Sequence, residues 1–242
     1  MTSTPLQHQA AVKAFYSTWD GQRTYVRPQT VIRLLQQHHL PADGEILDIG
    51  FGNGEITLAV AQAFPRARIT ALDLTQHNVQ MAQNKARQRN IHNIHFLVAD
   101  AETWQPPAAT YHAIYAMQLM QFIAQPDALL QRLFAGLKPG AALHFATPFL
   151  PPQAQLHPFF VEAYTRVIPN SFQYRTENAW FRALFNGGYE KLRVAKTHWE
   201  PSTQSATWQA HYHAARQNHG IDYETARRNT WGGIISARKP KA

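Results

Sequence analysis

The sequence predicts an α/β protein built on a doubly wound sheet, and two features of its pattern support this fold class. Short apolar runs of strand length alternate with amphipathic segments of helical length over most of the chain. A turn containing three glycines joins the first apolar run to the first amphipathic segment. At 242 residues the chain is long enough for one such domain with insertions.

The predicted elements follow from periodicity and from turn residues. Residues 5–40 are predicted to form two helices, the second beginning at Pro28. The predicted strands are 46–49, 68–72, 94–98, 112–117, 141–146, 189–199 and 230–238. The other predicted helices are 54–64, 76–89, 126–136, 159–167 and 176–186, with a helical insertion at 203–228. The prolines from Pro148 to Pro158 predict an interruption of regular structure.

The turn after the first strand indicates a ligand. It reads Glu45-Ile-Leu-Asp-Ile-Gly-Phe-Gly-Asn-Gly-Glu55, and its glycines let backbone amides approach a bound molecule with no Cβ in the way. Asp73 follows 23 residues after Gly50, beyond the second strand. That separation suits a carboxylate that binds a ribose hydroxyl across one β-α-β unit. The sequence therefore predicts a nucleoside-bearing cofactor.

The glycine spacing narrows the class of cofactor. Glu55 stands where a dinucleotide-binding fingerprint has its third glycine, and a carboxylate there would repel a phosphate. With Asp48 two residues before Gly50, the D-x-G-x-G-x-G form resembles motif I of the class I S-adenosylmethionine (SAM) dependent methyltransferases. Further landmarks of that family follow in order over about residues 40–147, namely Asp73-Leu74, Val98-Ala-Asp-Ala101, Tyr111 to Met117 and Leu137-Lys-Pro-Gly140.

The resemblance implies a seven-stranded, Rossmann-like sheet whose last strand is antiparallel. It also implies a single methyltransferase domain over 1–242, with an N-terminal helical segment at 1–40 and a SAM-binding core at 41–147. Cap insertions on the substrate side are expected at 148–188 and 200–229. This layout is similar to the group that holds ubiquinone-pathway and trans-aconitate methyltransferases.

The cofactor contacts that the resemblance implies lie at the ends of the first four strands and in the N-terminal segment. For the methionine end they are Asp48, Gly50, Gly52 and Gly54; for the ribose Asp73; for the adenine Leu74, Asp100 and Ala101; for the sulfonium Met117 and Gln118. Tyr16 or Arg23 is expected to close over the cofactor, with packing of Tyr16 against the core as the alternative. Each of the other side chains has a turn or capping role as its structural alternative.

Methyl transfer from a sulfonium is an in-line displacement, which depends mainly on holding the acceptor close, aligned and dry. A hydroxyl acceptor would need a general base, for which histidine is the usual residue. His157, His198 and His211 are the candidates, together with His213, and none stands out. His211 and His213 would point about 200° apart on a helix, so no metal site is expected.

Aromatic side chains are concentrated after the fifth strand. Residues 148–212 hold 13 aromatic residues in 65 positions, against 12% in the whole chain. Trp180, Phe181 and Phe185 recur at helical spacing, which predicts packing on the sheet. The remaining rings are expected either to form an ordinary core or to roof the substrate, and a roof would favour a flat or apolar acceptor.

Composition excludes several function classes. The chain has no cysteine, which excludes disulfides, thiolate nucleophiles and zinc-thiolate sites. It begins without a signal-peptide pattern and has no apolar run of about 18 residues, so a cytoplasmic protein that spans no membrane is expected. The net charge is +8, but residues 45–147 carry seven basic and seven acidic residues and no block of like charge appears. A solvated basic surface is therefore favoured over a nucleic-acid site.

These observations leave three functional hypotheses. The first is a SAM-dependent methyltransferase that acts on oxygen, nitrogen or carbon of a small aromatic or apolar metabolite and releases S-adenosylhomocysteine. The second is an RNA-directed methyltransferase, favoured by net charge alone. The third is a SAM-binding protein that catalyses a reaction other than methylation in natural-product biosynthesis. A homodimer is left open.

Overall fold

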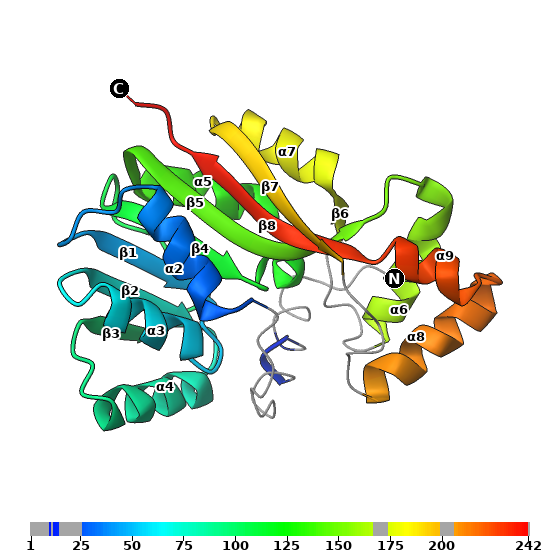
Figure 1. The fold of residues 1–242 in the computed structure, drawn as a ribbon, viewed down its shortest axis with the longest axis horizontal. Coiled ribbons are helices and arrows are strands. Elements are labelled where there is room, and N and C mark those ends of the chain that lie inside the picture. The colour runs from blue at the N-terminus through cyan, green and yellow to red at the C-terminus, as the bar shows by residue number, and fades with distance from the viewer. Residues whose placement is uncertain (1–9, 11, 15–25, 167–173, 199–205, 242) are drawn as a thin grey trace.

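The computed structural model of the chain describes residues 10, 12–14, 26–166, 174–198 and 206–241. Within these residues the main strands form one mixed sheet in the order β3-β2-β1-β4-β5-β8-β7 (Figure 1). The strands are β1 Glu45–Ile49, β2 Arg68–Asp73, β3 Ile94–Val98, β4 Tyr111–Met117, β5 Leu137–Leu150, β7 Glu190–His198 and β8 Trp231–Arg238. Neighbouring strands from β3 to β5 pair in parallel, whereas β8 runs antiparallel between β5 and β7. The predicted doubly wound sheet with an antiparallel last strand is confirmed.

The helices also fall close to their predicted positions. They are α2 Pro28–Gln37, α3 Glu55–Ala63, α4 Gln76–Gln88, α5 Pro126–Gly136, α6 His157–Thr165, α7 Glu177–Asn186, α8 Ala206–His219 and α9 Tyr223–Arg228. The insertion predicted at 203–228 is therefore two helices. The first predicted N-terminal helix lies mostly outside the described residues, and so do Tyr16 and Arg23. No helix in the described part of the chain is long and apolar enough to cross a lipid bilayer.

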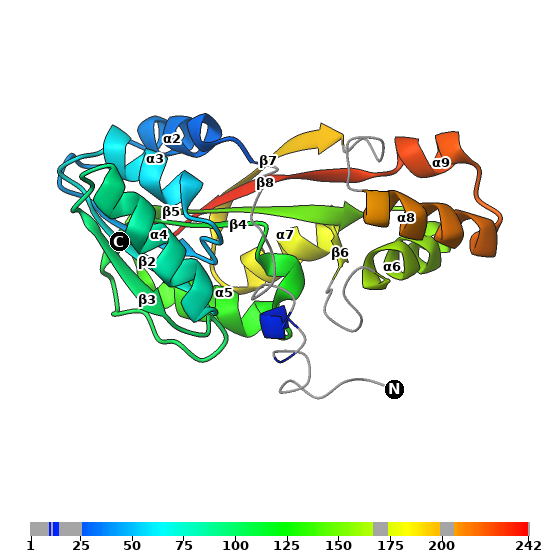
Figure 2. The same cartoon turned by 90° about the horizontal axis from the view of Figure 1, so that it is seen from below.

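Helices cover both faces of the sheet and bury it in two apolar layers. Helices α2 and α3 lie on one face, and α5 and α7 lie on the other (Figure 2). The first layer includes Val31 of α2, Val60 of α3 and Val79 of α4, while Leu133 of α5 and Trp180 of α7 belong to the second. Each such side chain contributes about 1.5–3 kcal/mol when it is fully buried. Because β1 to β5 run in parallel, the carboxyl ends of these five strands meet at one edge of the sheet.

Strand β5 is longer than predicted, because the strand continues through Pro148. Its pairing with β4 ends at Ala146, and a two-residue strand, β6 Arg175–Thr176, pairs with it from Phe149 onwards. Pro148 lies between these two pairings, at a position where a strand tolerates a missing N–H. The prediction that proline would end regular structure here was wrong.

Beyond the ends of β5 and β8, helices α6, α8 and α9 form a separate group, which we call the lobe (Figures 1 and 2). The lobe has its own apolar cluster, formed by Leu156, Phe159, Phe160, Ala163, Tyr212, Ala215 and Ala226. Phe159 packs edge-to-face against Phe160 and Tyr212, with ring centroids 4.7 and 5.2 Å away. The core of the lobe is thus formed mainly within the lobe, with Leu150 at the end of β5 packed against it.

The aromatic residues after β5 are mostly core residues. Phe149, Phe159 and Phe160 are buried in the sheet layer or in the lobe, and Trp180 packs on Phe145 with the ring centroids 5.2 Å apart. These four rings therefore pack in the core of the protein and do not cover a substrate. Phe185 is 73% exposed, so its predicted packing on the sheet was wrong. Phe172 and Trp199 lie outside the described residues.

Candidate cofactor and acceptor site

The three glycines between β1 and α3 all have left-handed backbone conformations. Their φ angles are +71° at Gly50, +57° at Gly52 and +79° at Gly54. A residue with a side chain pays roughly 1–2 kcal/mol in this region, whereas glycine does not. The loop therefore turns tightly from the strand into the helix.

Packing within the protein also requires glycine at Gly50 and Gly54. A Cβ at Gly54 would lie 2.8 Å from the Cβ of Ala82, so this glycine lets α3 approach α4. A Cβ at Gly50 would lie 2.9 Å from Cδ1 of Leu119, in the loop after β4. Both positions were predicted as methionine contacts, but packing against protein already requires a glycine at each of them.

Asp73 ends β2 and binds the glycine loop directly. Its Oδ2 accepts a 2.9 Å hydrogen bond from the N–H of Gly52. Its Oδ1 accepts from the N–H and the hydroxyl of Thr75, at 3.0 and 3.1 Å, and from the side-chain amide of Asn78 at 3.0 Å. Burial raises the pKa of Asp73, and the hydrogen bonds from Thr75 and Gly52 oppose that rise.

These contacts limit what Asp73 can still bind. An ionised carboxylate has about four lone-pair positions, two on each oxygen. Three donors already point at Oδ1 and one at Oδ2. The carboxylate thus has room for one further donor on Oδ2, which suits one ribose hydroxyl instead of the two that the resemblance implied.

Asp48 lies deeper, under the same loop. It is 2% exposed, and its Oδ2 accepts a 2.6 Å hydrogen bond from the hydroxyl of Thr57 on α3. Burial raises the pKa of Asp48 to about 7, against the effect of Thr57 and Tyr115, and the nearby charge of Asp73 raises it further. Little of the Asp48 side chain is therefore open to direct contact with a ligand.

Glu55 does not face the loop as a free charge. Its carboxylate forms ion pairs with Lys85 at 2.8 Å and with Arg89 at 2.9 Å, both on α4. Burial would raise the pKa of Glu55, but the hydrogen bonds and charges of these two residues outweigh it and lower the pKa. The repulsion of phosphate expected from Glu55 is thus largely offset, and Asp48 and Asp73 remain as the acidic groups of the loop.

The residues expected at the adenine form a fixed turn after β3. Oδ1 of Asp100 accepts from the N–H of Glu102 at 2.9 Å, so this carboxylate has a structural role in the turn. Ala101 is 8% exposed, and its carbonyl accepts from Arg132 of α5 at 3.1 Å. Leu74, after β2, is half-buried. The turn is therefore tied to α5, which fixes its backbone where an adenine is expected.

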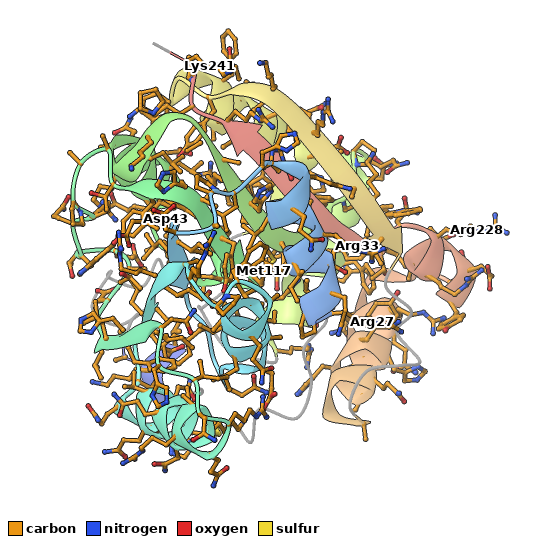
Figure 3. The ribbon with its side chains drawn as sticks, turned by 60° about the vertical axis from the view of Figure 1, so that its left-hand side comes forward. Arg27, Arg33, Asp43, Met117, Arg228 and Lys241 are labelled. Carbon is orange, nitrogen blue, oxygen red and sulfur yellow. The ribbon has the colours of Figure 1, made fainter. Side chains whose placement is uncertain are left out.

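The loop after β4 meets the glycine loop. Met117, the last residue of β4, is 9% exposed and packs in the same cluster as Phe51 of the glycine loop and Val26. Figure 3 shows Met117 near the middle of the molecule, close to α2 and α3. Gln118 follows with a φ of +64°, an uncommon value for a residue with a side chain. Met117 thus lies next to the glycine loop, and the contact of Met117 and Gln118 with a sulfonium stays a prediction.

The three candidate bases lie on three different elements, α6, β7 and α8. Nε2 of His157 donates to the carbonyl oxygen of Pro151 at 2.7 Å, which leaves only Nδ1 to accept a proton. His211 is half-buried on α8, and His213 is exposed on the same helix. His198 ends β7, and its side chain is not described. Among the described residues no group of three or more histidine, aspartate or glutamate side chains is arranged to bind a metal ion.

Sequence reasoning missed the residues that hold the carboxylates and loops in place. They are Thr57, which binds Asp48, Thr75 and Asn78, which bind Asp73, and Arg132, which binds Ala101. Thr75 also caps α4, where its hydroxyl accepts the Asn78 N–H at 3.2 Å. The Asp73-x-Thr75 spacing was a usable signal, because an aspartate commonly binds the backbone two residues on.

Comparisons with known proteins agree with this geometry. Residues 46–140 match the methyltransferase domain family. The chain is 28% identical over 154 residues to the malonyl-[acyl-carrier protein] O-methyltransferase of Paenibacillus sp. (strain JDR-2), covering 61% of this chain and 56% of that protein. It is 32% identical over 135 residues to the trans-aconitate 2-methyltransferase of Variovorax paradoxus (strain S110), covering 56% and 49%. The chain thus spans about half the length of the curated relatives it matches.

The fold is similar to that of solved methyltransferases. A geranyl diphosphate C-methyltransferase from Streptomyces coelicolor A3(2) superimposes with a TM-score of 0.77 over 99% of both chains, at 13% sequence identity. At this identity the likeness concerns the fold alone. The match over residues 46–140 and the strand order both agree with the resemblance to the class I SAM-dependent methyltransferases.

Proposed function

We propose that the chain is a SAM-dependent methyltransferase that acts on a small metabolite. The observation that carries the proposal is the glycine loop, which is left-handed at three positions and has the buried carboxylates of Asp48 and Asp73 beside it. A cationic cofactor suits two carboxylates, whereas a diphosphate would be repelled by them. The family match over residues 46–140 supports the same reading.

The residues present fit SAM. Asp73 has one acceptor position for a ribose hydroxyl, and the charge of Asp48 favours an ammonium at the loop. The fixed turn at Ala101 offers backbone groups to an adenine ring, and Met117 lies beside the loop where the sulfonium is expected. When bound, SAM supplies an electrophilic methyl group on a positively charged sulfur. The protein's part is to position the acceptor against that methyl group and to exclude water.

Small molecules are the proposed acceptors. The relatives bear the names of enzymes acting on trans-aconitate and on a malonyl group on a carrier protein, which gives the RNA alternative no support. Whether the acceptor is free or attached to a carrier is left to experiment, as is a homodimer. The lobe is the proposed substrate-side cap, since it extends beyond the end of the sheet.

Isothermal titration calorimetry with S-adenosylhomocysteine tests the proposal, with NADH as the dinucleotide control. We expect binding of S-adenosylhomocysteine and none of NADH. Incubation with methyl-labelled SAM then separates the alternatives, because label should enter a small-molecule extract and not tRNA. Cofactor binding without label transfer to either would favour the SAM-binding protein with another reaction, and absence of binding would refute the proposal.

A further inference from the structure

The loop after β4 is held in an unfavourable conformation by a buried amide network. Gln118 has a left-handed backbone, which costs energy in a residue with a side chain and persists only where the surroundings enforce it. Its N–H donates to the carbonyl of Ala146 on β5 at 3.0 Å. Gln121, in the short helix η1 Met120–Phe122, is 4% exposed and donates from Nε2 to the carbonyl of Gln118 at 3.1 Å.

The same network fixes which way the two amides face. A backbone carbonyl only accepts, so the end of Gln121 that meets the carbonyl of Gln118 must be its NH₂ group. That NH₂ group also lies 3.1 Å from the side chain of Gln118, so the atom it meets there must be the oxygen, Oε1. The other end of Gln121, Oε1, lies 3.4 Å from the hydroxyl oxygen of Thr147, which also lies 3.3 Å from the carbonyl oxygen of Pro148. Because that hydroxyl has a single hydrogen, the orientation rests on the carbonyl of Gln118.

Because its oxygen faces Gln121, the side-chain NH₂ group of Gln118 points away from Gln121. Its oxygen is engaged by Gln121, the residue is only half-buried, and its Nε2 has no hydrogen-bond partner within the described part of the chain. The next residue, Leu119, touches Gly50, and the preceding residue, Met117, packs with Phe51. The two free N–H groups therefore lie where the loop after β4 meets the glycine loop.

We propose that Gln118 is a specificity-determining residue that donates its NH₂ group to an anionic oxygen of the methyl acceptor, and that Gln121 is the positioning residue that keeps it turned outward. The inference rests on the proposed function and narrows it to acceptors such as carboxylates. A protonated amine would meet two donors and no acceptor at this position, which disfavours it.

A carboxylate acceptor also suits the chemistry of the site. A lone pair of the carboxylate oxygen forms the new O–C bond, and the S–C bond breaks with its electron pair remaining on sulfur. The carboxylate enters as an anion and leaves as a neutral methyl ester, so no proton has to be removed. None of His157, His198 and His211 is then needed as a general base.

Binding to the protein saturated with S-adenosylhomocysteine tests the inference without requiring turnover. The probes are matched pairs, namely benzoate with benzylamine, hexanoate with hexylamine, and glutarate with 1,5-diaminopentane, each titrated by calorimetry. We expect at least one carboxylate to bind about tenfold or more tightly than its amine partner. Gln118→Glu, which replaces the donors by a carboxylate of the same length, should abolish this preference, and so should the uncharged Gln118→Met.

A double-mutant cycle separates positioning by Gln121 from a general structural role. Gln121→Glu removes the donor to the carbonyl of Gln118 and should lower the carboxylate preference severalfold, but only while Gln118 is present. In the Gln118→Met background it should change nothing further. Gln131→Glu, the same substitution at an exposed position of α5, is the control and should behave as the wild type.

The outcomes distinguish this inference from the proposed function. If S-adenosylhomocysteine binds but no carboxylate is preferred over its amine, or the preference survives in Gln118→Glu, the inference is overturned and the proposed function stands. An equal effect of Gln121→Glu in both backgrounds would refute the positioning role. If S-adenosylhomocysteine itself does not bind, the proposed function falls together with the inference.

Discussion

The glycine-loop region and the lobe use buried side chains in opposite ways. Around the glycine loop, buried polar groups such as Asp48 and Asp73 bind backbone and hydroxyl groups and hold turns in unusual conformations. In the lobe the buried residues form an apolar cluster around Phe159, and the charged groups pair at the surface, as Glu162 does with Arg166.

This difference indicates that the glycine-loop region determines ligand binding, whereas the lobe contributes mainly to stability. Polar networks that enforce a fixed backbone prepare a site for a ligand of defined shape, whereas an apolar cluster chiefly supplies stability. The family match covers residues 46–140, which include the glycine loop and not the lobe. Ligand binding and stability should therefore respond to substitutions in different parts of the molecule.

The largest effect is expected from Gly52→Val, which should abolish binding of S-adenosylhomocysteine measured by calorimetry. The new side chain would take the space that the bound nucleoside is expected to need and would weaken the hydrogen bond to Asp73. Gly220→Val is the matched control, because Gly220 has a similar φ of +61° and nothing within 4 Å of its Cβ position. The control should lose similar stability and bind normally. Retained binding in Gly52→Val would contradict the role of the loop.

In the lobe, Phe159→Ala should lower the free energy of unfolding by about 3–5 kcal/mol, as expected for a fully buried phenylalanine. Urea denaturation measures this change, and Phe185→Ala, at a position that is 73% exposed, is the control with little expected effect. The folded Phe159→Ala protein should bind S-adenosylhomocysteine as the wild type does. A large loss of affinity would show that the two regions are not separable.

Asp48→Asn should flatten the pH dependence of stability. The folded-state pKa of about 7 lies above the unfolded value near 3.9, so between these pH values the folded protein binds more protons and loses stability as pH rises. Above pH 7 the variant should be more stable than the wild type by up to about 4 kcal/mol. Urea denaturation at pH 5 and pH 8 measures the difference, with the exposed Asp43→Asn as control. Parallel curves for the variant and the wild type would argue against a buried, proton-binding Asp48.

Asp73→Ala should weaken binding of S-adenosylhomocysteine by roughly 1–3 kcal/mol, because a ribose hydroxyl and the Gly52 N–H both lose their acceptor. Asp222 is the matching carboxylate in the lobe, where it caps α9 by accepting from Thr225. Asp222→Ala should cost about 1 kcal/mol of stability and leave binding unchanged. An unaltered dissociation constant in Asp73→Ala would count against the ribose contact.

Sequence reasoning predicted the positions of helices and strands better than the contacts between them, for a physical reason. Strand and helix positions such as 94–98 and 126–136 follow from local periodicity and turn residues, and the structure places elements at the same residues. The exposed Phe185 and the role of Gln121 depend on which elements meet across the fold. Helical spacing predicts which face of a helix is apolar, but it does not predict how much of that face the sheet covers. No local sequence pattern indicates that a buried amide holds a neighbouring turn.

The glycine positions show the same limit within a recognised motif. The spacing of Gly50, Gly52 and Gly54 predicted the loop, and all three are left-handed. It did not predict that Gly54 is required by Ala82 of α4, because that contact joins two helices across the fold. A motif therefore identifies the site, and the packing around it decides what each residue does.

A crystal structure of the complex with S-adenosylhomocysteine tests the assignment of the site most directly. We predict density for the nucleoside over the glycine loop, with a ribose hydroxyl about 2.6–3.2 Å from Oδ2 of Asp73 and the sulfur near Met117. Density for the ligand elsewhere on the protein, with Asp73 keeping only its contacts to Gly52, Thr75 and Asn78, would contradict it.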